Sequence, residues 1–224
     1  MQLDIRNQGT SEGTSQTPVA SPRTASMATM TRTFSGSPAE ASAWLRRQAW
    51  DRDDDVAALE RAFRSGGVPV IEGEFRGFLL HSVSGTWLDR VFELSSKLFS
   101  PWRGKALDGR TASADNLVTW FGMLLLRAIA PYAYFRRRRG AWHAVTMSAR
   151  VESSRVVAGL NVLALDYDAP ANRPLLRSVR DEVVEIAPGI CLGRAHVRAR
   201  DGAYRVVQWF TLERLDASGA ARPR

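Results

Sequence analysis

Histidine and cysteine, the side chains most often used as bases, nucleophiles or zinc ligands, are few in this 224-residue chain and widely spaced. The histidines are His81, His143 and His196, and Cys191 is the single cysteine. A single cysteine excludes a disulfide scaffold and a cysteine-based zinc site. The chain has no H-E-x-x-H motif of zinc proteases and no glycine-rich motif that cradles nucleotide phosphates. We therefore expect neither a metal nor a cofactor.

A few residues are still candidates for acid–base chemistry. His196 lies between Arg194 and Arg198 in an alternating pattern, and nearby cations lower the pKa of a histidine and leave a neutral base. The alternative is a half-exposed strand histidine without a role. Carboxylates near predicted strand ends could serve as a pocket acid or base, although such residues are usually solvated turn residues; they are Asp166, Asp168, Asp181 and Glu182.

A long apolar segment precedes a run of arginines. Residues 117–135 contain one charged side chain, Arg127, and Arg136, Arg137, Arg138 and Arg139 follow. Length and flanking cations suit a membrane span, but Arg127 and Pro131 oppose insertion. We favour a buried helix or strand with a solvated arginine end. The alternative is a surface-bound helix, with the arginines on the phosphates of an anionic membrane. No nucleic-acid-binding motif accompanies the run, so we expect no nucleic-acid partner.

Composition divides the chain into segments. Hydrophobic residues make up 45% and charged residues 24%, which suits a globular protein, and the net charge is +8. Residues 1–37 contain 13 Ser or Thr and few large apolar groups, which predicts a disordered tail. They lack the apolar segment of a secretory signal, so we expect a cytoplasmic protein, with peripheral association at the inner membrane as an alternative. Residues 217–224 resemble a second disordered tail.

The ordered part begins with helices. Ser37, Pro38 and Glu40 fit the N-cap, the first position and the acid of a capping box. Residues 53–55 can cap a second helix, which Gly66-Gly67 ends. We expect a helical lead-in over residues 38–67. A β-rich domain should follow over residues 68–216, with a hydrophobic insertion at about 117–139.

The clearest strand pattern lies near the end of the chain. Residues 190–199 alternate, with Cys191, Ala195 and Val197 on one face. Asp201-Gly202 predicts a two-residue hairpin turn and a return strand over 203–213. The resulting register puts Gln208 opposite Ala195, on the apolar face. We expect that face to line an interior; the reverse orientation would bury two arginines and require anions to meet them.

Further strands are predicted over residues 144–152, 155–167 and 177–186, joined by short turns without helices. Such an arrangement indicates an antiparallel sheet or barrel. We predict an α+β protein in which short N-terminal helices are followed by an antiparallel, lipocalin-like β-barrel.

Two short motifs of the β-rich region resemble those of a known family. Residues 73–77 read G-E-F-R-G before an apolar run, and residues 102–105 read W-R-G-K before Leu107-Asp108. Together they resemble the GXWXG-domain family, with Phe75 where that family has tryptophan. Tyr167-Asp168, Pro170 and the segments 177–181 and 210–214 are similar to its later region. The resemblance covers about residues 68–108 and 155–214, and it implies a small β-rich fold without implying an activity.

Small barrels enclose an apolar interior that can hold one ligand. The function that we predict is therefore binding of a small hydrophobic molecule in the barrel, without catalysis. The expected contact residues are Phe75, Trp102, Lys105, Tyr167 and Gln208, although for Phe75 and Trp102 a role as core plugs is favoured over ligand contact. Lys105 is one of two lysines in an arginine-dominated chain. The alternatives are an isomerase, dehydratase or cyclase that uses a pocket carboxylate or histidine, and a peripheral membrane or interaction module that uses residues 117–140.

Overall fold

The computed structural model describes residues 36–48, 55–83, 101–129, 135–138, 141–172, 174 and 176–215. All described residues belong to one compact unit, Thr31–Arg224. The predicted tails, Pro131 and Arg139 lie outside the described residues, apart from the last two residues of the tail predicted over 1–37.

Two short helices begin the described chain, as the capping pattern predicts. In α1 (Pro38–Gln48), the Ser37 backbone N–H donates to Glu40 Oε2 at 2.6 Å and the Glu40 N–H donates to Ser37 Oγ at 3.3 Å. These two bonds form the expected capping box. The second helix, α2 (Asp55–Ser65), ends where the Gly66 N–H donates to the Phe63 carbonyl. A Cβ at Gly66 would lie 2.6 Å from a methyl group of Val184, so a glycine is needed for the close approach to the sheet.

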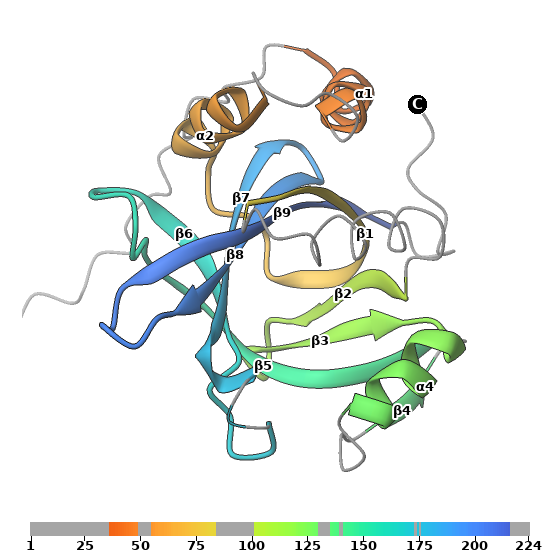
Figure 1. Cartoon of the computed structure of the whole chain (residues 1–224). Coiled ribbons are helices and arrows are strands. Elements are labelled where there is room, and N and C mark those ends of the chain that lie inside the picture. The colour runs from red at the N-terminus through yellow and green to blue at the C-terminus, as the bar shows by residue number, and fades with distance from the viewer. Residues whose placement is uncertain are drawn as a thin grey trace, which may run out of the picture. The chain divides into compact units, whose positions relative to one another are not determined.

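An eight-stranded antiparallel barrel follows the helices (Figure 1). The described residues form nine strands, eight of which make the barrel. They are β1 (Glu72–Ser82), β2 (Trp102–Asp108), β3 (Ser113–Val118), β4 (Phe135–Arg138), β5 (Ala141–Ser153), β6 (Asn161–Asp166), β7 (Val179–Ala187), β8 (Ile190–Arg198) and β9 (Tyr204–Arg214). Their order is β3-β2-β1-β9-β8-β7-β6-β5, and pairing between β3 and β5 closes the ring. The short strand β4 pairs with the first part of β5 outside the ring. The predicted fold class is confirmed.

Alternation along the strands produces two apolar layers. Inward side chains such as Phe75, Met147 and Phe210 form one cluster inside the barrel. Outward side chains of the wall, among them Val184 and Trp209, form a second cluster with Leu45 of α1 and Phe63 of α2. The helices therefore cover the outer face of the wall, and the barrel interior is a separate environment.

The C-terminal hairpin has the predicted faces but a different turn. Ala195 pairs with Gln208 as expected, whereas nearer the turn His196 pairs with Val206 and Arg198 with Tyr204. The Ala199 N–H donates to the Ala203 carbonyl, so the loop is longer than two residues. A bulge between Ala195 and His196 then restores the register.

The predicted strand over residues 155–167 is wrong in its first half. Residues 154–160 form a loop, and β6 begins only at Asn161. The Ser154 hydroxyl accepts bonds from the N–H groups of Val156 and Val157, and Gly159 has a φ of 77°. These local bonds give the backbone an alternative to a sheet ladder despite the apolar sequence.

The long apolar segment is divided between a strand end and a helix. Residues 117–118 end β3, and α4 (Trp120–Ile129) follows. Its Met123 and Leu126 pack against the apolar side chains inside the barrel. None of the helices among the described residues is long and apolar enough to cross a membrane.

Candidate functional site

The two glycine motifs pair with each other in the barrel wall. Phe75 pairs with Lys105 and Arg76 with Gly104 across β1 and β2. A Cβ at Gly77 would lie 2.3 Å from the Trp102 ring, so the absent side chain makes room for the indole. At Gly104, with a φ of 139°, a Cβ would lie 1.9 Å from the Phe75 carbonyl oxygen. The glycines thus permit the close approach of backbone and rings that the sequence predicts.

Four polar side chains meet inside the barrel at Lys105. The Lys105 ammonium lies 2.8 Å from Asp181 Oδ2 on β7 and donates to the Tyr167 hydroxyl at 2.9 Å and to Asn116 Oδ1 at 2.8 Å. The Tyr167 hydroxyl donates to Asp181 Oδ2 at 2.9 Å. The Trp102 indole N–H donates to Asn116 Oδ1 at 3.1 Å. We call Lys105, Asn116, Tyr167 and Asp181 the interior cluster.

Burial and charge fix the protonation of the interior cluster. Lys105 is 1% exposed and Asp181 2%. Burial by itself lowers the pKa of the Lys105 amine, but the Asp181 carboxylate and the Tyr167 hydroxyl outweigh it, so the pKa is raised. Burial and then the Asp181 charge raise the pKa of the Tyr167 hydroxyl to about 12. Lys105 is therefore a permanent cation and Tyr167 a neutral phenol at physiological pH.

Aromatic rings surround the Lys105 ammonium. It lies 5.7 Å from the ring centroid of Trp102, 5.4 Å from that of Tyr167 and 5.6 Å from that of Phe210. Trp102 and Phe210 also contact each other edge to face at 5.7 Å. Ring faces are attractive to a cation at these distances. The arrangement suits hydrogen bonding at one polar point in an apolar enclosure, and an ammonium without a free lone pair is unsuited to nucleophilic attack.

Gln208 lies on the interior face, as the hairpin predicts, but its amide is already bonded. Its side-chain N–H₂ donates to the carbonyls of His81 and Trp209, and its oxygen accepts from Ser82 at 2.6 Å. No open space lies beside Gly193 on this face, because a Cβ there would lie 2.3 Å from the Phe210 ring. Cys191 is buried on the same face, and burial raises the pKa of its thiol, as expected for an inert core residue.

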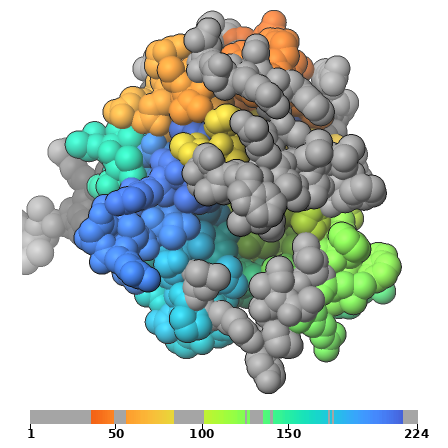
Figure 2. Space-filling view, viewed as in Figure 1, coloured from red at the N-terminus to blue at the C-terminus, as the bar shows by residue number. Residues whose placement is uncertain are grey.

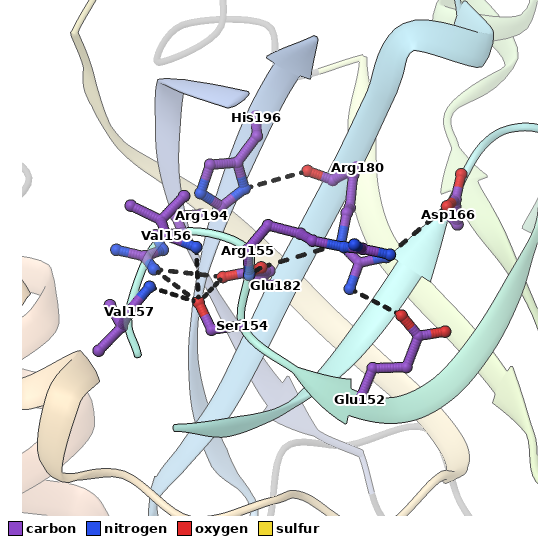
Figure 3. Close-up of polar contacts among 10 residues, drawn as sticks. All are labelled: Glu152, Ser154, Arg155, Val156, Val157, Asp166, Arg180, Glu182, Arg194 and His196. Atoms are coloured by element: carbon purple, nitrogen blue, oxygen red, sulfur yellow. Dashed lines mark hydrogen bonds and ion pairs between the residues drawn. The ribbon is translucent and has the colours of Figure 1, made fainter. Parts of the chain in front are cut away.

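A second polar cluster lies on the opposite face of β7 and β8, outside the barrel (Figure 3). Adjacent residues of a strand point to opposite faces, so Glu182 faces outward where Asp181 faces inward. Glu182 accepts from the Ser154 hydroxyl and from the Arg155 backbone N–H, both at 2.7 Å. Arg194 donates to Glu182 at 3.2 Å and to Glu60 of α2 at 3.0 Å. We call Glu182, Arg194, Arg180 and His196 the wall cluster.

The wall cluster buries both of its guanidinium groups. Arg194 lies over the Phe63 ring at 4.1 Å, beneath α2, and Arg180 donates to Glu152 at 3.0 Å. Carboxylates meet both cations, which is the condition for burying such groups. The bonds from Glu182 to Ser154 and Arg155 hold the loop 154–160 on the wall. These contacts are structural ties between elements, and they face away from the barrel interior.

His196 is fully buried, which corrects the expectation of a half-exposed residue. Its Nδ1 donates to the Arg180 carbonyl at 3.3 Å, and its Nε2 has no partner among the described residues. The pKa of His196 is lowered, as predicted, but burial is the main cause; Glu182 opposes the shift and Arg194 adds to it. Its place outside the barrel separates it from the interior cluster.

The remaining candidates lie on the surface. Arg136, Arg137 and Arg138 form most of β4 and are exposed. Asp168 pairs with Arg177 at 2.6 Å, where both side chains are largely exposed. The structure therefore brings Phe75, Trp102, Lys105 and Tyr167 together and leaves the arginines elsewhere. Sequence reasoning missed Asn116, which carries no motif signal, and weighed Asp181 only as one of several strand-end acids.

Comparison with known proteins finds a similar solved structure but no matching family. No protein-family model and no curated protein matches the chain, so the resemblance to the GXWXG-domain family stays a prediction. A crystal structure of a protein from Thermomonospora curvata is similar, with a TM-score of 0.47 and 17% sequence identity, over 79% of this chain and 97% of that one.

Proposed function

We propose that the barrel binds one small, mainly apolar molecule and that the interior cluster holds the polar end of that molecule. The observation that carries the proposal is the buried ion pair of Lys105 and Asp181 inside a mainly apolar barrel. Replacing a buried ion pair by apolar side chains of similar volume is often neutral or stabilising. Core packing alone therefore does not explain why Lys105 and Asp181 are charged residues, whereas recognition of a ligand does.

The chemistry of the cluster narrows the class of ligand. Lys105 and Asp181 neutralise each other, so the ligand needs no compensating charge. Both contacts of Asp181 are made by Oδ2, so Oδ1 is the oxygen at which a ligand donor would be received. We infer a neutral hydroxyl or amide N–H at the polar end and an apolar body against the rings of Trp102 and Phe210.

The protonation states favour binding over catalysis. The raised pKa of Lys105 keeps the amine protonated, and the pKa of about 12 keeps the Tyr167 hydroxyl neutral. Neither group is then a base or nucleophile at neutral pH. Both remain good hydrogen-bonding groups, which is what a binding site requires.

The test is a fluorescence titration with N-phenyl-1-naphthylamine, an uncharged apolar probe. We expect saturable binding to one site per chain and displacement by 1-octanol more readily than by n-octane, because the hydroxyl can bond to the interior cluster. Tyr167→Phe removes one hydroxyl from the cluster and should reduce the preference for the alcohol. Tyr204→Phe, outside the barrel, is the matched control and should leave it unchanged.

Two further variants locate the probe. Phe121→Ser, on the exposed face of α4, should leave probe binding unchanged if the probe lies in the barrel. Gln208→Leu tests whether the polar end lies at Gln208 instead, in which case the alcohol preference would fall in that variant alone. A folded protein that does not bind the probe would overturn the proposal, as would an alcohol preference that Tyr167→Phe leaves intact.

A further inference from the structure

The helix α4 is apolar on the face that points away from the barrel. Trp120 is 64% exposed, Phe121 55% and Leu124 44%. Residues three and four apart lie on one side of a helix, so these side chains form one stripe, which the exposed Arg127 continues by one turn. Figure 2 shows this segment, in green, at the surface of the molecule.

The opposite face of α4 is occupied. Met123 and Leu126 pack against the apolar side chains inside the barrel. The Thr119 hydroxyl caps the helix by accepting from the Gly122 N–H at 3.0 Å. A Cβ at Gly122 would lie 2.3 Å from the Pro101 carbonyl oxygen, so the helix is pressed against the start of β2. The outer stripe is therefore held in place by the barrel and is not a frayed end.

Further cations lie on an element that adjoins the same strand as α4. Strand β4 pairs with β5, which α4 also contacts. Arg136 and Arg138 lie on one face of β4, where Arg136 pairs with Asp115 at 3.0 Å and Arg138 is exposed. Arg137 lies on the other face, over the Trp142 ring. Neither α4 nor β4 contains an acidic residue. The surface thus combines exposed aromatic rings with uncompensated positive charge.

We propose that this surface docks on an anionic lipid bilayer. The docking surface consists of Trp120, Phe121, Leu124, Arg127 and Arg138. The helix would lie in the plane of the interface, with its rings among the headgroups and upper acyl chains. Trp120 suits this depth, because tryptophan is enriched at membrane interfaces. Arg127 can extend its charged end to the phosphates while its stem lies along the apolar stripe.

Charge and shape favour a bilayer over other partners. Nucleic acid would also attract the arginines, and Trp120 and Phe121 could stack on bases. However, the aliphatic Leu124 extends the stripe along the helix and gains from acyl chains rather than from stacking. A second copy of the chain would bring one set of arginines close to another, which opposes association.

The test is co-sedimentation of the full chain with vesicles. We expect binding to phosphatidylcholine vesicles that contain phosphatidylserine, little binding to phosphatidylcholine alone, and release at high salt. Arg127→Gln with Arg138→Gln should lower the partition coefficient roughly 25-fold, at about fivefold per arginine. Phe121→Ser should lower it about tenfold or more, because one ring no longer inserts.

Matched variants elsewhere on the surface serve as controls. Arg198→Gln with Arg200→Gln removes two exposed cations from the C-terminal hairpin, and Val156→Ser removes an exposed apolar side chain from the loop on β7. Val156→Ser should leave the partition coefficient unchanged. The double arginine variant should lower it only as far as the smaller net positive charge of the whole protein weakens its attraction to anionic vesicles. The proposal is overturned if anionic vesicles do not bind the protein, or if replacing the two hairpin arginines lowers vesicle binding as much as replacing Arg127 and Arg138. It is also overturned if Phe121→Ser changes the oligomeric state but not vesicle binding. The same holds if Phe121→Ser leaves vesicle binding intact and the protein still binds DNA.

Discussion

The ion pair of Lys105 and Asp181 should be a strongly coupled element of stability. Lys105→Met keeps the length of the side chain, removes the ammonium and leaves the Asp181 carboxylate buried with Tyr167 as its donor. Both charges are almost wholly excluded from solvent, so removal of one should cost ~3–5 kcal/mol in free energy of unfolding. That is a large part of the roughly 5–15 kcal/mol that stabilises a typical domain.

Three further variants distinguish the interaction energy of the ion pair from the energy of the other contacts of each side chain. Asp181→Asn should cost a similar amount, because the ammonium then lacks its counter-charge. The double variant Lys105→Met/Asp181→Asn leaves neither charge alone, so its cost should fall short of the sum by about 2 kcal/mol or more. The exposed pair of Arg205 and Asp201, which is 3.0 Å apart, is the matched control: Arg205→Met should cost less than about 1 kcal/mol.

Urea unfolding followed by tryptophan fluorescence measures these differences, provided that the m-value is unchanged. The reasoning is refuted if Lys105→Met costs no more than Arg205→Met. It is also refuted if the costs of the two single substitutions simply add, because additivity would mean that the two charges do not interact.

Three further predictions concern pH and backbone space. Stability should fall as the pH rises from 10 toward 12, because the unfolded chain releases the Tyr167 proton near pH 10 and the folded chain keeps it to about 12; urea unfolding of Tyr167→Phe should show a shallower slope there. Stability should also fall below about pH 6.5, because the lowered pKa of His196 lets the unfolded chain take up a proton first. His196→Gln should flatten that slope, and an unchanged slope would contradict the argument. Gly104→Ala should cost about 3 kcal/mol or more, through a backbone clash at a positive φ, and a near-native melting temperature would count against it.

The C-terminal hairpin shows which structural features the local sequence pattern can predict and which it cannot. Alternation over β8 correctly put Cys191 and Ala195 inside and Arg194 outside, because a buried face must be continuous. The turn was predicted one residue too short, and the bulge near Ala195 compensates for it. Nothing in the local sequence signals that bulge. The register in the middle of the hairpin was therefore right although the prediction near the turn was wrong.

Tertiary contacts decided the elements that sequence could not place. Residues 155–160 are apolar enough for a strand, yet the Ser154 hydroxyl and Glu182 hold them as a loop. The buried state of Arg194 depends on Glu60, 134 positions away. Closure of the barrel rests on pairing between β3 and β5 across the segment that contains α4. Alternation within a strand carries no information on such distant partners.

The lysine at position 105 is the one sequence signal that pointed directly to the interior cluster. In a chain whose other cations are almost all arginines, position 105 has three acceptors around a compact ammonium with three N–H donors. An arginine would bring five donors in a planar fork, and a buried donor without a partner costs ~1–3 kcal/mol. The match between donors and acceptors explains why lysine occupies this position. Composition alone could flag the residue, but only the fold reveals the acceptors from β3, β7 and Tyr167 that make an amine necessary.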